Sequence, residues 1–178
     1  MATTPSSAII IGIKVHSSEG LALMKSAVKS LSSLIQLVAI SSIYRIQAKA
    51  EFNAHIHDLR SYAIFEGLVV AMKGFCSLPP DRLAQELQKI EGQLRNEALR
   101  QSVSITLNFY GAATMMTPNL TLPDPAFHLR PENVLPAAEI SAEFVHPVLQ
   151  KTLRELAKPF VSTSWGEFVA QGKAMLDF

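Results

Sequence analysis

Polar and apolar side chains alternate along residues 102–109, so the two kinds point to opposite faces if this segment is a strand. The polar set is Ser102, Ser104, Thr106 and Asn108, and the apolar set is Val103, Ile105, Leu107 and Phe109. A strand with this pattern buries one face and turns the other toward solvent or a cleft. The side chains of the polar set carry no charge.

His55 and His57 are separated by one residue and are followed by Asp58. Alternate residues of an extended segment share a face, so these side chains have the ligand types of a zinc or other transition-metal site. No third and fourth ligand is evident nearby unless Asp58 turns inward. The missing ligands favour the other interpretation, which is a pair of solvated histidines in a long polar loop that ends near Arg60.

The remaining reactive residue types have plain structural interpretations. Cys76 follows an apolar strand and has no histidine near it in sequence, which indicates a buried structural thiol. Gly12-Ile13-Lys14 lacks the spacing of a phosphate-binding P-loop. Gln88 and Glu91 lie three residues apart on a predicted helix and share a face, which is either a ligand-binding surface or an ordinary solvated one.

The composition predicts a cytoplasmic globular protein. The chain has 178 residues, of which 48% are hydrophobic and 17% charged, with a formal net charge of +1. This apolar content suffices for a core, and the lack of a basic excess argues against a nucleic-acid partner. A single cysteine excludes an internal disulfide and favours a reducing compartment. The N-terminal apolar run is too short for a signal peptide or a membrane span, so no membrane partner is expected.

The predicted elements follow the order strand, helix, strand, strand, helix, strand, which is the split βαβ arrangement of ferredoxin-like α+β folds. The predicted strands are 8–13, 37–44, 62–72 and 102–109, and the predicted helices have apolar stripes over 21–34 and 83–94. We expect one domain over 1–178, with an antiparallel sheet and helices packed on one face in a core of about 8–147. A C-terminal helical extension is expected over about 147–178, clearest at 147–156. Trp165 and Phe168 either form an exposed docking segment or, as we favour, pack a terminal helix onto the core.

Five segments, in order along the chain, resemble motifs of the 6-hydroxymethyl-7,8-dihydropterin pyrophosphokinase family of folate biosynthesis. Ser41–Arg45 is similar to the S-S-x-Y-R strand end, Leu83–Glu91 to the helix that ends in Q-x-I-E, Phe109–Gly111 to the end of the D-L-D-I-L-L-Y-G strand, Leu120–Pro123 to L-T-L-P-H, and Arg130–Ile140 to R-x-F-V-L-x-P-L-x-E-I-A-P. The resemblance covers roughly residues 8–147. It implies transfer of a pyrophosphoryl group from ATP to the hydroxymethyl group of a reduced pterin.

The resemblance also implies a magnesium site, which this sequence does not preserve. The family holds magnesium with two aspartates on alternate positions of one strand, and these positions are Ser104 and Thr106 here. Phosphoryl transfer depends on positioning and on neutralising the developing charge, chiefly through the metal. Two alcohols supply no negative charge, so the metal site is degenerate.

The positions that the resemblance assigns to the substrates are partly changed. The pterin-pocket positions are Ile46, Gln47, Phe65, Gly67 and Glu132, where the family has a threonine-proline pair, an asparagine and a stacking aromatic residue among others. Asp124 replaces the histidine of L-T-L-P-H and would repel ATP phosphates. The positions that still match family residues around ATP are Gln88, Glu91, Thr121 and Arg130.

Three hypotheses follow from the combination of matched framework and changed site. The favoured one is a divergent, non-pyrophosphorylating relative, monomeric or homodimeric, that binds a pterin- or nucleotide-like ligand or a protein partner. The second is an active pyrophosphokinase in which Asp124, Glu132 or Glu91 holds magnesium with ATP. The third is an enzyme of a modified-pterin pathway that uses the altered pocket.

Overall fold

A six-stranded sheet forms the centre of the molecule, and β1 (Ser7–His16) lies inside it. β1 pairs antiparallel with β5 (Ser102–Tyr110) on one side and with β4 (Gly67–Cys76) on the other. Its run of isoleucines is buried on both faces of the sheet, which explains the central position. The computed structural model describes residues 6–17, 20–46, 67–97, 99 and 101–176.

The second predicted strand is divided into two strands that both pair with β4. These are β2 (Gln36–Ile40) and β3 (Ile43–Ile46), and the sheet order is β5-β1-β4-β3-β8 with β2 also on β4. This antiparallel order is that of the ferredoxin-like split βαβ fold, which is thereby confirmed. The predicted third strand, 62–72, ends later than expected, at Cys76, and its first five positions lie outside the described residues.

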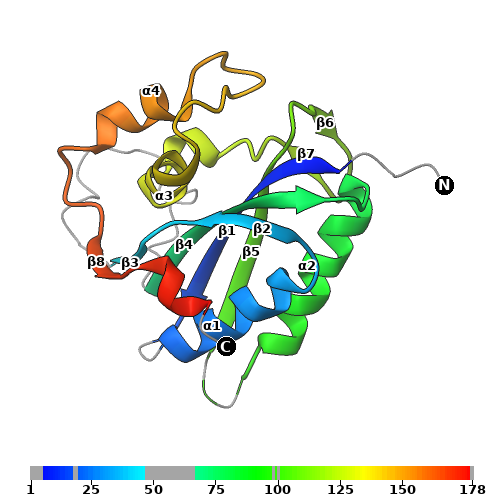
Figure 1. Cartoon of the computed structure of the whole chain (residues 1–178), viewed down its shortest axis with the longest axis vertical. Helices are drawn as coiled ribbons and strands as arrows, with labels where there is room; N and C mark the ends of the chain where they lie inside the picture. The colour runs from blue at the N-terminus through cyan, green and yellow to red at the C-terminus, as the bar shows by residue number, and fades with distance from the viewer. Residues whose placement is uncertain (1–5, 18–19, 47–66, 98, 100, 177–178) are drawn as a thin grey trace.

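Helices α1 (Gly20–Ser32) and α2 (Pro80–Leu94) cover one face of the sheet, as expected (Figure 1). The residues that α1 buries include Met24, Val28 and Leu31, and those that α2 buries are Leu83, Leu87 and Ile90. Leu21, in the first turn of α1, is 41% exposed and does not belong to the buried stripe. The predicted apolar stripes are otherwise confirmed, except that α1 ends at Ser32, before the last position of the predicted stripe 21–34.

A further layer covers the opposite face of the sheet, and it contains a helix that the sequence patterns did not predict. This is α3 (Pro131–Ser141), which with α4 (Leu153–Ala157) packs over a second core centred on Phe109 and Phe127 (Figure 1). Pro131 is tolerated in the first turn because the amides there have no helical partner. Pro136 lies inside the helix and is buried, so tertiary packing outweighs the local preference against helix.

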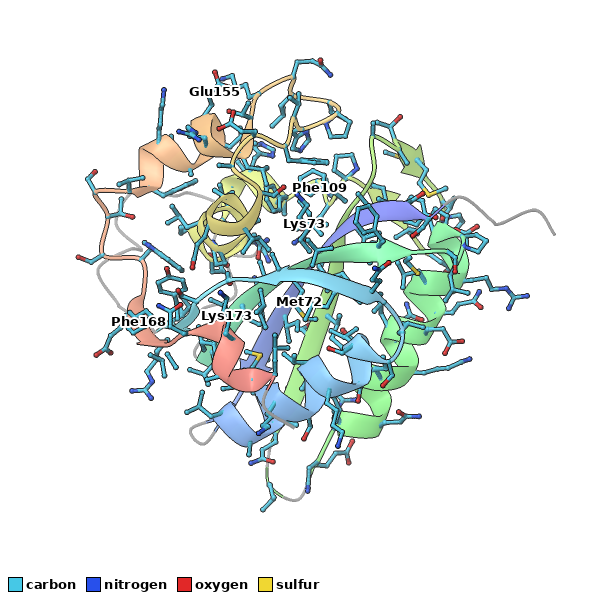
Figure 2. The ribbon with its side chains drawn as sticks, viewed as in Figure 1. Met72, Lys73, Phe109, Glu155, Phe168 and Lys173 are labelled. Carbon is cyan, nitrogen blue, oxygen red and sulfur yellow. The ribbon has the colours of Figure 1, made fainter. Side chains whose placement is uncertain are left out.

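Phe109 faces this second core, which contradicts the expectation that it points the same way as Val103, Ile105 and Leu107. The pairing of β1 with β5 shifts register between Ile10 and Ile11, opposite Asn108. A bulge of this kind adds one residue to the strand and reverses the alternation beyond it. Figure 2 shows Phe109 and Lys73 on the α3 side of the sheet.

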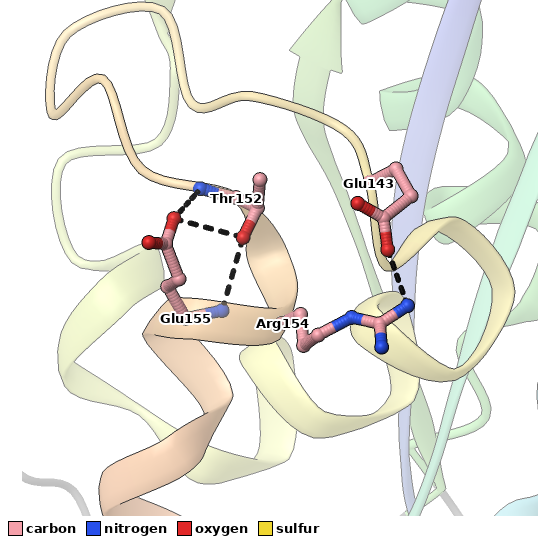
Figure 3. Close-up of polar contacts among 4 residues, drawn as sticks. All are labelled: Glu143, Thr152, Arg154 and Glu155. Carbon is pink, nitrogen blue, oxygen red and sulfur yellow. Dashed lines mark hydrogen bonds and ion pairs between the residues drawn. The ribbon is translucent and has the colours of Figure 1, made fainter.

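The C-terminal segment is only partly helical. Residues 147–152 form a loop, and α4 begins after Thr152, whose side chain and that of Glu155 form a reciprocal capping box (Figure 3). Two 3-10 helices, Lys158–Phe160 and Gly172–Met175, flank the strand β8 (Glu167–Ala170). The expectation of a terminal helix is therefore wrong for β8, which pairs with β3 through backbone hydrogen bonds that side-chain periodicity does not reveal.

Two residues fix this C-terminal segment against the sheet. The ring of Trp165 lies 4.7 Å from that of Tyr44 in β3, between ring centroids. Gly172 approaches the backbone carbonyl of Ser41 so closely that a Cβ atom would lie 1.9 Å from its oxygen, so only glycine fits. The ring of Phe168 also meets that of Tyr44, edge-on with centroids 6.4 Å apart, but Phe168 is 55% exposed, so its expected packing is confirmed only in part (Figure 2).

Two shorter strands, β6 (Met115–Met116) and β7 (Thr121–Leu122), form a hairpin at the end of β5. A 3-10 helix, Phe127–Leu129, then leads into α3. Among the described residues, no helix has the length and apolar character needed to cross a membrane.

Candidate functional site

Lys14 in β1 lies directly opposite Ser104 in β5, and Gly12 lies opposite Thr106. Residues paired in this way project their side chains on the same face of a sheet. That face is the one covered by α3, because Ile13 and its alternate neighbours belong to the core under α1 and α2. The ammonium group of Lys14 and the hydroxyl groups of Ser104 and Thr106 therefore lie on the same part of this face, where the resemblance implies a metal site.

Lys14 pairs across this face with α3. Its Nζ lies 3.3 Å from Oε1 of Glu132, and the two side chains are 14% and 17% exposed. Burial lowers the pKa of Lys14, although Glu132 and, less strongly, Asp124 act to raise it, while Arg130 lowers it further. We call Lys14, Asp124, Arg130 and Glu132, with the hydroxyls of Ser104 and Thr106, the β1–α3 site.

The residues of the β1–α3 site do not fit magnesium. Neither Ser104 nor Thr106 carries a charge, and the nearest charge across the strands is the cation of Lys14. Magnesium prefers anionic oxygens in near-octahedral geometry. Within the described part of the chain, no three histidine, cysteine, aspartate or glutamate side chains are grouped to hold a metal ion.

The three carboxylates that could replace the lost aspartates already have protein partners. Glu132 pairs with Lys14, and Oδ1 of Asp124 accepts a hydrogen bond of 3.2 Å from the backbone N–H of Ala126. Oε1 of Glu91 accepts one of 2.5 Å from the backbone N–H of Ile105. β5 lies at the edge of the sheet, so the backbone N–H of Ile105 that points away from the sheet has no strand partner there and donates to Glu91 instead.

A pocket of about 420 Å³ lies between α2 and the β6–β7 hairpin. Gln88 lines it from α2, and Asn119 and Leu120, next to Thr121, line it from the hairpin. Of the four residues expected to lie near a nucleotide, Gln88 therefore lines this pocket and Thr121 is adjacent to it in sequence. The third, Glu91, lies one turn beyond Gln88 and contacts the edge of β5, and the fourth, Arg130, lies at the start of α3.

The expected pterin-pocket residues are brought together only in part. Ile46 and Gly67 are directly paired between β3 and β4, whereas Glu132 belongs to the ion pair with Lys14. Gly67 has a φ of 153°, a conformation that other residues rarely adopt. Gln47 and Phe65 lie outside the described residues, as do His55 and His57.

Some of the matched motif residues have structural roles. Glu139 accepts hydrogen bonds from Ser42 and from the hydroxyl of Tyr44, which ties α3 to the corner between β2 and β3. Burial raises the pKa of Tyr44, and Glu139 raises it further. The hydroxyl of Ser41 accepts from the backbone N–H of Ala71 at 2.9 Å. The contacts of Glu139 position α3 over the sheet and therefore position Glu132.

Sequence reasoning missed two residues of this region. Lys14 was noted only as a departure from a motif, and its pairing with Glu132, 118 residues away, has no local signal. Asn108 is 1% exposed, and neither its Nδ2 nor its Oδ1 has a hydrogen-bond partner among the described residues. Its amide lies 3.0 Å from where a Cβ atom of Gly12 would be.

Comparison with known proteins identifies relatives of one kind. No family model matches the chain. A 2-amino-4-hydroxy-6-hydroxymethyldihydropteridine pyrophosphokinase of Synechocystis is 36% identical over 84 residues, which is 45% of this chain and 43% of that protein's length. The enzyme of the same name from Aquifex aeolicus is 23% identical over 161 residues, covering 85% of this chain and 94% of its own length.

Solved structures resemble the chain in fold. Plasmodium falciparum HPPK-DHPS in a triple-mutant form with SDX-DHP superposes with a TM-score of 0.68 at 12% identity, over 89% of this chain and 45% of that one. The wild-type protein with pterin and p-hydroxybenzoate has a TM-score of 0.64 at 12% identity, over 91% and 44% respectively. The chain therefore spans less than half of these proteins and of the Synechocystis relative, and at this identity the structural likeness concerns the fold.

Proposed function

We propose that this chain is a divergent member of the 2-amino-4-hydroxy-6-hydroxymethyldihydropteridine pyrophosphokinase family that binds a pterin- or nucleotide-like ligand and does not transfer pyrophosphate. The observation that carries the proposal is the position of Lys14. Its cationic side chain lies opposite Ser104, on the face that also carries Thr106, where the family resemblance places the two metal-binding carboxylates.

Electrostatics supports the loss of the metal-dependent step. A divalent cation beside Ser104 and Thr106 would be repelled by the protonated Lys14, and these two hydroxyls carry no charge to attract it. The carboxylate of Glu132 reduces this repulsion, but it is engaged in the ion pair with Lys14. Without the metal, the developing charge on a transferring phosphoryl group lacks its main stabilisation.

The pocket between α2 and the β6–β7 hairpin supports retained ligand binding. Its volume of about 420 Å³ is in the range of small-molecule sites. The amides of Gln85, Gln88 and Asn119 line it, and amides can both donate to and accept from the heteroatoms of a purine or pterin ring. These groups favour a small-molecule ligand over a protein partner as the occupant of this pocket.

The alternative of an active enzyme with rearranged ligands has less support. Glu132 would have to leave its partner Lys14, and one oxygen each of Glu91 and Asp124 is already engaged by the backbone N–H of Ile105 and of Ala126. A buried lysine that loses its carboxylate is strongly destabilising. An enzyme of a modified-pterin pathway remains the third hypothesis, and a ligand screen separates it from the others.

The deciding experiment is turnover of ATP with hydroxymethyldihydropterin and magnesium. We expect no release of AMP, and no magnesium-dependent binding of ATP by calorimetry. The Aquifex aeolicus relative, assayed in parallel, shows that the substrates and conditions are competent. Release of AMP by this chain at a rate comparable to that relative would refute the proposal.

A thermal-shift screen of pterins and nucleotides identifies the ligand class. A ligand that binds the folded state raises the melting temperature by mass action. Gln88→Leu should abolish the shift for a ligand of the α2 pocket, while Lys89→Leu, a change of an exposed residue on the same helix, should leave it intact. A shift that survives Gln88→Leu would place the ligand elsewhere.

A further inference from the structure

We infer that the β1–α3 site has inverted its polarity and binds the phosphate groups of a ligand directly, without a divalent cation, with Lys14 as the cation that contacts them. This inference rests on the proposed function, because it names the chemical group of the ligand that would lie beside Ser104 and Thr106. Its basis is the set of groups that share one face of β1 and β5.

The strand pairing determines which groups share this face. Lys14 is opposite Ser104, and Thr106 is two residues further along β5 on the same side. A carboxylate accepts hydrogen bonds and attracts cations, whereas an alcohol can donate a hydrogen bond to an anionic oxygen. Two alcohols and an ammonium in place of carboxylates are therefore complementary to an oxyanion.

The cation of Lys14 is held in a desolvated place. Its side chain is 14% exposed, and its partner Glu132 is 17% exposed. A hydrogen bond between an ammonium and phosphate is strong when both are shielded from water. Arg130, which acts electrostatically on Lys14, supplies a second positive charge at the start of α3.

Glu132 is the main competitor for this cation, and Asp124, the other carboxylate of the β1–α3 site, opposes an anion more weakly. Glu132 lies in the first turn of α3, where the helix dipole favours a negative charge, and it contacts Lys14 of β1. A phosphate that binds Lys14 must displace this carboxylate or share the ammonium with it. Removal of the charge at Glu132 should therefore strengthen binding, while removal of the charge at Lys14 should weaken it.

A second observation points to a missing polar partner beside this face. The amide of Asn108 is 1% exposed and lacks a partner for either of its polar atoms among the described residues. It lies against Gly12, whose strand partner is Thr106. Buried amides are rarely left unpaired, so the region next to the two hydroxyls has a donor and an acceptor to offer to a ligand or to a water that accompanies it.

The test is calorimetric titration of pyrophosphate and of inorganic phosphate into the whole chain in excess EDTA. We expect binding of pyrophosphate that EDTA does not abolish and that weakens as salt is added. Acetate is the matched anion without phosphorus. Absence of EDTA-resistant binding, or equal affinity for acetate, would overturn the inference.

Three variants locate the binding. Lys14→Met should weaken pyrophosphate binding by about tenfold or more, as expected for one charge-assisted hydrogen bond. Glu132→Gln should tighten it several-fold, a gain that misfolding cannot produce. Lys73→Met is the control, since Lys73 is on the same face of the sheet but bonds to Ser141 at 3.1 Å. An equal loss in Lys73→Met, or a loss in Glu132→Gln, would contradict the inference.

The pyrophosphate titration and the turnover assay test different statements, so either can fail without the other. Release of AMP refutes the proposed function whatever the pyrophosphate titration gives. Absence of EDTA-resistant binding together with absence of AMP refutes only the assignment of Lys14 as a phosphate-binding cation.

Discussion

Oε1 of Glu139 accepts hydrogen bonds from both the backbone N–H and the hydroxyl of Ser42, at 3.0 and 2.7 Å. Its Oε2 accepts one of 3.1 Å from the hydroxyl of Tyr44. Ser42 is only 6% exposed, so loss of the carboxylate leaves buried donors without a partner. We expect Glu139→Ala to lower the free energy of unfolding by about 2 kcal/mol, measured by urea denaturation.

Glu143→Ala is the matched control for this prediction. Glu143 lies just beyond the end of α3 and pairs with Arg154, and both side chains are more than half exposed (Figure 3). An exposed ion pair contributes at most about 1 kcal/mol, so this variant should unfold nearly as the wild type does. Equal losses in the two variants would show that the contacts of Glu139 add nothing beyond surface charge.

His146 makes stability depend on pH. It is 3% exposed, and its Nδ1 accepts hydrogen bonds from the backbone N–H groups of Val148 and Leu149. Burial lowers the pKa of His146 below 6.5, and the neighbouring His128 lowers it further. The unfolded chain therefore takes up the proton first as pH falls, so the free energy of unfolding should be highest above pH 6.5 and should decrease below it.

The variant His146→Asn isolates this effect, because an amide oxygen can accept the same backbone hydrogen bonds but does not titrate. The difference in unfolding free energy between wild type and variant should shrink as pH falls below 6.5. His16, whose pKa is lowered by burial and by Lys14, contributes equally to both proteins and cancels. A difference that stays constant with pH would exclude His146 as the titrating group.

The ion pair of Lys14 and Glu132 should show strong coupling in a double-mutant cycle. Removal of one partner leaves a mostly buried charge alone, so Lys14→Met should cost about 2 to 3 kcal/mol of unfolding free energy. Replacement of both, Lys14→Met with Glu132→Leu, should come within about 1 kcal/mol of the wild type, because a buried pair is often no better than packed apolar groups. Additive losses, measured by urea denaturation, would mean that the two side chains act independently.

The sequence predicted those elements whose pattern is local and periodic. The alternation of β5 and the stripes of α1 and α2 follow from side-chain spacing alone, and they define the order of the split βαβ fold. The direction of the Phe109 side chain was mispredicted because a bulge at Asn108 reverses the alternation of faces, and no change in residue type signals this bulge. Helix α3 was not predicted because its two prolines are unfavourable for a helix locally. It is stabilised by tertiary packing against the second core.

The sequence located the candidate site through the two missing aspartates, but it did not predict the side chains that surround that place. The matched strand located Ser104 and Thr106, and the structure gives them Lys14 as a neighbour through strand pairing. Glu132 was expected in a pterin pocket, but it reaches this lysine from a helix that begins 117 residues further along the chain. Contacts at such separation depend on how two layers pack on a sheet, which spacing along one segment does not encode.

Restoration of a metal site should require the removal of Lys14 as well as the return of two carboxylates. In Ser104→Asp/Thr106→Asp, the ammonium lies across from the new aspartates and should pair with them, so magnesium should give little thermal stabilisation. In the triple variant that adds Lys14→Asn, the two carboxylates lack that internal cation and should bind magnesium. The measurement is the shift in melting temperature on adding magnesium, with calcium for comparison. Equal shifts in melting temperature with magnesium in the double and triple variants would show that Lys14 does not prevent magnesium binding at this face. The electrostatic argument against metal-dependent transfer would then be wrong.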